Sequence, residues 1–241
     1  MGVNWQRRLE EMRVKDAPGP TKFADATVAT LIAQNVAIRP ECPAIVMSRG
    51  KVLTYCALGE QIAAFGAGLR ANGIGRCSTV AIMLPDGPEL AVAIVATACH
   101  AVAVPLNPKL TATELDSLFA MLHVDAMVIS NRVDSTARDV AARHGTRLLD
   151  AAIGGPGILT FSAGTAVTSA WVDSELALER GAQPDDLALI LRTSATTGRP
   201  KLVPVTHRNL VIGADRRRGW FNLTPDDRTL CAMPLHYAQG L

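Results

Sequence analysis

The sequence predicts an α/β fold in which a mostly parallel sheet carries helices on both faces. Helix-like and strand-like segments alternate through the middle of the chain, and 49% of its 241 residues are hydrophobic. Such alternation indicates right-handed βαβ units, whose parallel strands are buried on both sides. Only 4% of the residues are aromatic, so we expect a core of Ala, Val, Leu and Ile.

The N-terminal part is expected to form an arm, a helix and a hairpin. Residues 1–20 are polar and end in Ala-Pro-Gly-Pro, which indicates a loose arm. Residues 26–38 carry apolar positions at helical spacing and are closed by Arg39-Pro40. Two apolar runs, 44–47 and 52–55, flank Ser48-Arg49-Gly50-Lys51, a pattern typical of a hairpin.

The next segments are expected to supply the parallel sheet and its covering helices. A helix over 57–71 should stop at Asn72-Gly73, and Pro88 suits the first turn of another helix. Either Thr111 or Thr113 can cap the helix after that. Strands are expected over residues 80–84, 101–104 and 126–130, and further helices over 88–99, 113–122 and 134–144.

Composition divides the chain into four parts. An α/β subdomain over 21–150 follows the arm. Residues 151–184 are rich in Gly, Ala, Ser and Thr, and they are interpreted as a long connection with short strands. Residues 185–241 form the last unit, in which the apolar runs 187–191 and 202–205 are expected to be strands.

Charge and cysteine usage exclude several classes of function. The net charge is +2, which indicates no nucleic-acid or anionic-membrane partner. The five cysteines lack C-x-x-C spacing, which argues against a metal site and a disulfide framework. They are expected to be small core residues in a cytoplasmic protein. The longest apolar stretch, 90–106, is interrupted by His100 and Pro105, so no membrane span is expected.

Gly66 and Gly68 faintly resemble a dinucleotide fingerprint, but they lie inside a helical pattern rather than after a strand. We interpret them as small residues that let a helix pack closely on its neighbour.

A hydroxyl-rich loop between the two final strands carries the strongest functional signal. It reads Thr193-Ser194-Ala195-Thr196-Thr197-Gly198-Arg199-Pro200-Lys201. Backbone N–H groups and four hydroxyls can wrap a polyphosphate, Lys201 adds positive charge, and Gly198 and Pro200 set the turn. The alternative is a polar surface turn, which such clusters often form.

Together with other motifs, this loop resembles the phosphate loop of the adenylate-forming (AMP-binding) superfamily, whose pattern is [ST]-[ST]-G-[ST]-[ST]-G-x-P-K-G. The resemblance covers roughly residues 25–241. It continues in Thr206-His207-Arg208-Asn209-Leu210 and in the segment from Met233 to Leu241, Met-Pro-Leu-His-Tyr-Ala-Gln-Gly-Leu. Upstream matches occur in order at residues 53–55, 80–85 and 104–108.

The resemblance implies the N-terminal portion of a carboxylate–CoA ligase. Such an enzyme joins a carboxylic acid to ATP, giving an acyl-adenylate and pyrophosphate, and then transfers the acyl group to the thiol of CoA or of a phosphopantetheine carrier. ATP, Mg²⁺ and CoA would be the cofactors. The implied phosphate-binding residues are Thr193, Ser194, Ala195, Thr196, Thr197, Gly198 and Lys201, with Thr197 and Lys201 catalytic. His236, Tyr237 and Gly240 would border the acyl and adenylate pocket.

Some expected parts of the family pattern differ or are absent. Ala195 and Leu202 stand where the family has glycine, as do Cys77 and His100. If the glycine at 195 has a positive φ, alanine strains the loop by ~1 kcal/mol; otherwise its methyl group only crowds the phosphate. No metal ligand is expected within the chain, because the family's Mg²⁺-linked Glu, in Y-G-x-T-E, should lie beyond Leu241.

Two interpretations therefore remain: part of an active ligase, or a non-catalytic nucleotide-binding or interaction module. In the first, the 241 residues alone are expected to be inactive. They are also expected to self-associate, as a homodimer or larger oligomer, through the strand at 187–191 and a strand near 230–233.

Overall fold

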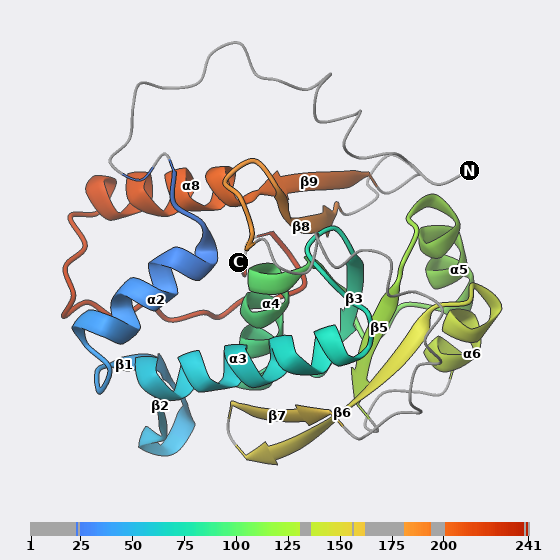
Figure 1. Cartoon of the computed structure of the whole chain (residues 1–241), viewed down its shortest axis with the longest axis horizontal. Coiled ribbons are helices and arrows are strands. Elements are labelled where there is room, and N and C mark those ends of the chain that lie inside the picture. Colours follow the sequence, from blue (N-terminus) through green and yellow to red (C-terminus); the bar gives the residue numbers. More distant parts are fainter. Residues whose placement is uncertain are drawn as a thin grey trace, which may run out of the picture.

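The centre of the structure, a computed structural model, is a seven-stranded sheet (Figure 1). The structure describes residues 23, 25–130, 136–155, 157–161, 181–193, 201–238 and 240. The strands are β3 (Thr79–Met83), β4 (Val102–Pro105), β5 (Ala126–Ser130), β6 (Arg147–Gly155), β7 (Ile158–Phe161), β8 (Leu187–Arg192) and β9 (Leu202–Thr206). Their order is β7-β6-β5-β3-β4-β8-β9, parallel except for antiparallel pairing of β7 and β9 at the two edges. The predicted α/β class with a mostly parallel sheet is confirmed.

Helices cover both faces of this sheet because alternate strand residues point to opposite sides. Val80 and Ile82 of β3 pack with α3 (Tyr55–Ala71) and α4 (Pro88–His100). Ala81 and Met83 pack on the opposite side with α5 (Ala112–Met121) and α6 (Thr136–Arg143). All five residues of β3 are buried, as expected for a central parallel strand.

The remaining elements adjoin the α3–α4 layer. Helix α2 (Val28–Ile38) contacts α3, α4 and α8 (His207–Trp220), while α8 also contacts β9. The predicted hairpin is present as β1 (Pro43–Val46) and β2 (Val52–Thr54), joined through the short 3₁₀ turn η1 (Ser48–Gly50).

Side-chain caps determine where several helices begin. Thr54 caps α3 by accepting a hydrogen bond from the Ala57 N–H, which starts this helix two residues before the predicted position 57. Of the two candidate caps for α5, the structure uses Thr111, in a reciprocal capping box with Glu114. The predicted stop of α3 is confirmed, since Asn72 is its C-cap and Gly73 has a φ of 69°.

The close-packing role predicted for Gly66 and Gly68 is confirmed. A Cβ at Gly66 would overlap the His100 imidazole, and one at Gly68 would overlap the Phe161 ring of β7. His100 Nε2 lies 3.1 Å from the Ile62 carbonyl oxygen, which holds the ring over Gly66. His100, which stands at a family glycine position, therefore has a packing role between α4 and α3.

Side chains of two helices also accept hydrogen bonds from backbone amides that point outward near the β7 edge of the sheet. The Leu159 N–H donates to Gln61 Oε1 of α3 at 3.0 Å. The Gly157 N–H, just before β7, donates to Glu89 Oε1 of α4, also at 3.0 Å. These side chains satisfy backbone donors that an edge strand would otherwise leave open.

Two expectations about exposed strands were wrong. Residues 230–233 form no strand, because no neighbouring strand within the described residues pairs with them, and Leu230 is 89% exposed. The strand over 187–191 is not an open edge, since β8 lies between β4 and β9 and buries Ala188, Leu189 and Ile190.

The expectation that the cysteines are core residues holds for Cys99 and fails for three others. Cys42, Cys77 and Cys231 are exposed. Burial raises the pKa of the Cys99 thiol to about 12. No helix in the described part of the chain is both long enough and apolar enough to cross a membrane.

Candidate nucleotide and acyl-group site

The base of the predicted phosphate loop is a closed hairpin. Strands β8 and β9 pair up to Arg192 opposite Leu202. Beyond them, the Thr193 N–H donates to the Lys201 carbonyl at 2.9 Å, and the Lys201 N–H donates to Thr193 Oγ1 at 3.1 Å. The two ends of the loop are thus held side by side. The other predicted phosphate ligands, Ser194, Ala195, Thr196, Thr197 and Gly198, lie outside the described residues.

An ion pair ties this loop base to the start of α5. Arg192 Nη2 lies 3.2 Å from Glu114 Oε1, while Glu114 Oε2 accepts hydrogen bonds from the Thr111 N–H and hydroxyl at 3.0 Å each. The hydrogen bonds from Thr111 are the largest cause of the lowered pKa of the Glu114 carboxyl, and the hydrogen bond from Arg192 lowers this pKa further. Sequence reasoning missed Arg192, although its charge next to a hydroxyl-rich loop was a visible signal.

Leu202, one of the departures from the family pattern, lies in β9 rather than in the loop. It pairs with Arg192, and its side chain packs against the core on the α5–α6 side of the sheet. A side chain at this position therefore extends the core.

A network of ion-pair and hydrogen-bond contacts, most of it partly exposed, fixes the opposite end of the β8–β9 hairpin. Asp186, just before β8, forms a two-pronged ion pair with Arg76 and accepts the Gln183 N–H at 2.7 Å. The His207 N–H donates to the Asp186 carbonyl at 3.0 Å. His207 is itself buried, and its Nδ1 accepts the Val28 N–H of α2 at 3.3 Å. His207 therefore joins the starts of two helices.

Acidification is expected to destabilise this fold through three histidines. Burial lowers the pKa of His100, His207 and His236. A base with a lowered folded pKa favours the neutral form in the folded state, so stability is lost as the pH falls below about 6.5, the unfolded value. The unfolding midpoint in urea, measured from pH 7.5 to 5.5, should fall. His207→Asn keeps an acceptor for the Val28 N–H but does not titrate in this range, so the unfolding midpoint of the variant should fall less steeply with pH. An equally steep fall in the variant would contradict this prediction.

The predicted acyl-pocket residues lie in a compact turn against the end of β3. The Tyr237 N–H donates to the Pro234 carbonyl at 3.1 Å, and the Gly240 N–H donates to the Tyr237 carbonyl at 2.9 Å. A Cβ at Gly240 would overlap the Pro234 carbonyl, so close backbone approach requires glycine there. The His236 ring is buried and packs on Tyr237, with ring centroids 4.3 Å apart.

Asp86, which sequence reasoning missed, attaches this turn to the sheet. Its Oδ1 accepts the Leu235 N–H at 3.1 Å and lies 3.8 Å from His236 Nδ1. Asp86 follows β3, while Thr193 follows β8, and both strands run parallel with β4 between them. With a strand spacing of ~4.8 Å, the ends of β3 and β8 lie about 10 Å apart. The carboxyl edge of an open parallel sheet is where such folds bind ligands.

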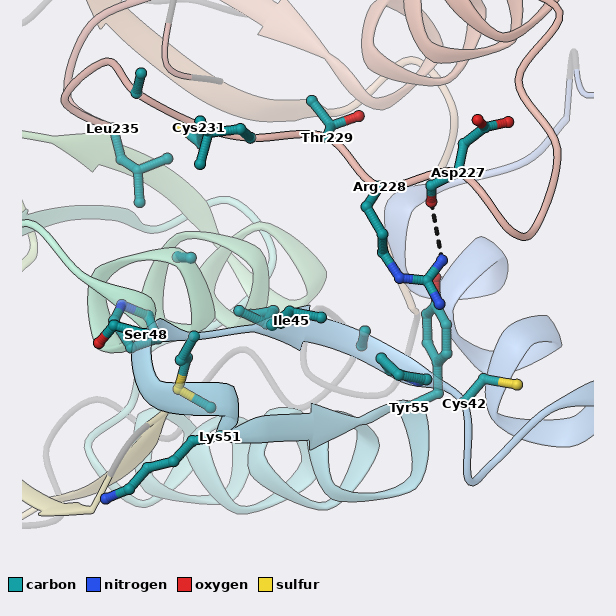
Figure 2. Close-up of a pocket in the computed structure, with 18 of the residues that line it drawn as sticks. Cys42, Ile45, Ser48, Lys51, Tyr55, Asp227, Arg228, Thr229, Cys231 and Leu235 are labelled. Atoms are coloured by element: carbon teal, nitrogen blue, oxygen red, sulfur yellow. Dashed lines mark hydrogen bonds between the residues drawn. The ribbon is translucent and has the colours of Figure 1, made fainter.

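A separate groove of about 1490 Å³ lies between the β1–β2 hairpin, the start of α4 and residues 223–235. Figure 2 shows Ile45, Lys51 and Tyr55 on the hairpin side, with Arg228 and Leu235 on the other chain segment. Asp86 and Leu235 also line this groove, whereas Thr193 and Lys201 do not. The groove therefore adjoins the His236 turn and is distinct from the loop base.

Comparison with known proteins gives a consistent set of similarities. Residues 32–241 match the family model described as AMP-binding enzyme. The sulfoacetate–CoA ligase of Cupriavidus necator is 32% identical over 218 residues, which cover 89% of this chain and 42% of that protein. The oxalate–CoA ligase of Arabidopsis thaliana is 31% identical over 225 residues, covering 90% and 42%.

Solved structures show the same relationship. The ATP-bound MatB from Rhodopseudomonas palustris superposes with a TM-score of 0.71 at 26% identity, over 89% of this chain and 42% of that one. The chain thus spans about 42% of the length of these relatives.

Proposed function

Because the chain belongs to the AMP-binding enzyme family, we propose that it supplies the phosphate loop and part of the acyl pocket of an ATP-dependent carboxylate–CoA ligase. The family resemblance of its motifs is confirmed by this match. The relatives named above are CoA ligases, which supports the reaction class.

One observation carries the proposal: the hydroxyl-rich loop leaves and re-enters the sheet at a hydrogen-bonded base, Thr193 with Lys201, at the carboxyl edge. Amide and hydroxyl donors with a lysine suit a polyphosphate. The exposed Lys201 side chain is free to reach a ligand, since only the backbone atoms of this residue make the closing bonds.

In the proposed reaction, a substrate carboxylate oxygen attacks the α-phosphorus of ATP, and the bond to pyrophosphate breaks. The thiol of CoA then attacks the acyl carbon and AMP leaves. This chain would contribute positioning and charge stabilisation, with the loop on the β- and γ-phosphates and His236 and Tyr237 beside the acyl group. Within the described residues, no three His, Cys, Asp or Glu side chains cluster to hold a metal. The Mg²⁺ that the family resemblance implies would bind together with ATP and neutralise charge on its phosphates.

A protein that contains this chain should release pyrophosphate from ATP in the presence of its acid and should form the acyl-CoA. A first panel follows the relatives' names: sulfoacetate, oxalate, hydroxybenzoates and ferulate. Pyrophosphate release and mass spectrometry of the CoA product measure the two half-reactions separately. ATP binding without turnover on a broad acid panel would favour the second candidate, a non-catalytic nucleotide-binding module.

Ala195 is the observation that favours this second candidate, and restoring glycine tests it. Ala195→Gly should tighten ATP and tripolyphosphate binding by up to about 1 kcal/mol, or about fivefold, if the loop needs a left-handed residue or a closer backbone approach. Titration calorimetry of both forms measures this. Ala214→Gly, on an exposed position of α8, controls for a general effect of glycine on the protein. Equal affinities of wild type and Ala195→Gly would show that the methyl group is harmless.

A further inference from the structure

We propose that Asp86 is a positioning residue for His236. Its carboxylate holds the backbone beside the imidazole in place, and it orients the ring so that Nδ1 faces the carboxylate. The catalytic consequence rests on the proposed function, which places His236 in the acyl pocket. The pairing itself rests on the geometry and the charges around the imidazole.

The first support is a long-range hydrogen bond. Asp86 lies between β3 and α4, and its Oδ1 accepts the Leu235 N–H at 3.1 Å, although 149 residues separate the two. The Leu235 side chain packs against the core on the α3–α4 side. Asp86 therefore holds the residue immediately before His236 against the end of the sheet.

The second support is the burial of the His236 imidazole together with its unsatisfied hydrogen-bonding capacity among the described residues. The His236 side chain is only 6% exposed, and both of its nitrogens are buried without a hydrogen-bond partner among the described residues. Buried polar atoms are nearly always paired. Nδ1 lies 3.8 Å from Asp86 Oδ1, so a small rotation of either side chain would pair them. A carboxylate at Nδ1 places the proton there and leaves Nε2 as the acceptor for a substrate or another group.

The charges around the ring point to the same residue. Burial lowers the pKa of His236, and the negative charge of Asp86 opposes that effect. Glu89, in the first turn of α4, directs its Oε1 to the Gly157 N–H, and the uncharged Tyr237 ring packs on the imidazole in a tilted arrangement. Within the described part of the chain, Asp86 is thus the charged group that acts on His236.

Two variants separate the contributions of Asp86. Asp86→Asn keeps an oxygen that can accept the Leu235 N–H but removes the charge, whereas Asp86→Ala removes both. In ¹⁵N-labelled protein, nitrogen chemical shifts of His236 report its tautomer and its titration midpoint. We expect wild-type His236 to be protonated at Nδ1 in its neutral form. The midpoint should move to lower pH in Asp86→Asn, and Asp86→Ala should also weaken amide protection at Leu235.

An Nε2-protonated ring in the wild type, or an unchanged His236 midpoint in a folded Asp86→Asn variant, would overturn the proposal. The wild-type tautomer measurement decides the question even if a variant fails to fold. His207, whose Nδ1 already accepts the Val28 N–H, provides an internal reference with the opposite tautomer.

Kinetics in a ligase that contains this chain extend the test. Asp86→Asn should lower kcat/KM for the acid and move the acid limb of the pH profile to lower pH, with the KM for ATP unchanged. A purely structural loss would reduce all parameters together without moving that limb. If the nitrogen shifts agree and no acyl-adenylate forms on any acid, the proposed function fails and the Asp86–His236 pairing stands. If the enzyme is active and the shifts disagree, only the pairing fails.

Discussion

Lys201→Gln is expected to weaken ATP binding by roughly 10- to 100-fold. A charge-assisted hydrogen bond between an ammonium group and a phosphate oxygen is worth ~1.5–3 kcal/mol, and each 1.4 kcal/mol corresponds to tenfold in affinity. The substitution should leave the loop base intact, because Thr193 pairs only with the backbone N–H and carbonyl of Lys201. The loss would therefore report the side chain and not a collapse of the hairpin.

Titration calorimetry with ATP and with inorganic tripolyphosphate measures this effect, since the second probe lacks adenosine and isolates the phosphate contacts. Lys201→Arg is the matched control: it keeps the charge and should retain most of the affinity. A higher salt concentration should narrow the difference between wild type and Lys201→Gln, because screening weakens the charge term. Indistinguishable affinities for all three proteins would remove Lys201 from the site.

Gly66→Ala is expected to destabilise the fold by ~1–3 kcal/mol, the usual cost of inserting a methyl group into a packed interior. The new Cβ would overlap the His100 imidazole, which is held by the Ile62 carbonyl and cannot move without losing that bond. Gly213→Ala in α8 is the matched control, since nothing lies within 4 Å of its added Cβ. It should stabilise the helix by up to ~1 kcal/mol.

Urea unfolding measures both changes, and a double variant tests the cause. If the imidazole is the obstacle, Gly66→Ala should cost much less in a His100→Ala background, a coupling that independent sites do not show. Additive effects, or a Gly66→Ala protein as stable as wild type, would contradict the packing explanation.

Local patterns in the sequence were sufficient for the regular elements. Asn72-Gly73 ends α3 and Pro88 begins α4 because caps act within one helical turn. The predicted strand 126–130 coincides with β5, a continuous apolar run buried on both faces. The loop base was also predictable, since two apolar runs bracket the hydroxyl-rich segment.

Contacts between distant residues were not predictable in this way. Asp86 reads as an ordinary turn residue before a helix, and its role depends on a partner 149 positions away. Arg192 meets Glu114 only because β8 ends beside the start of α5. The strand expected near 230–233 failed for the same reason, since an apolar run becomes a strand only where another strand is available to pair with it.

The bonds from Gln61 and Glu89 near β7 have a consequence for how the protein behaves at high concentration. An open edge strand can template the addition of a strand from another molecule, which is a common route into aggregates. At β7, the amides of Gly157 and Leu159 are already occupied by helix side chains, so an incoming strand would have to displace them first. The helices that build the core thus also protect the β7 edge of the sheet from pairing with another molecule.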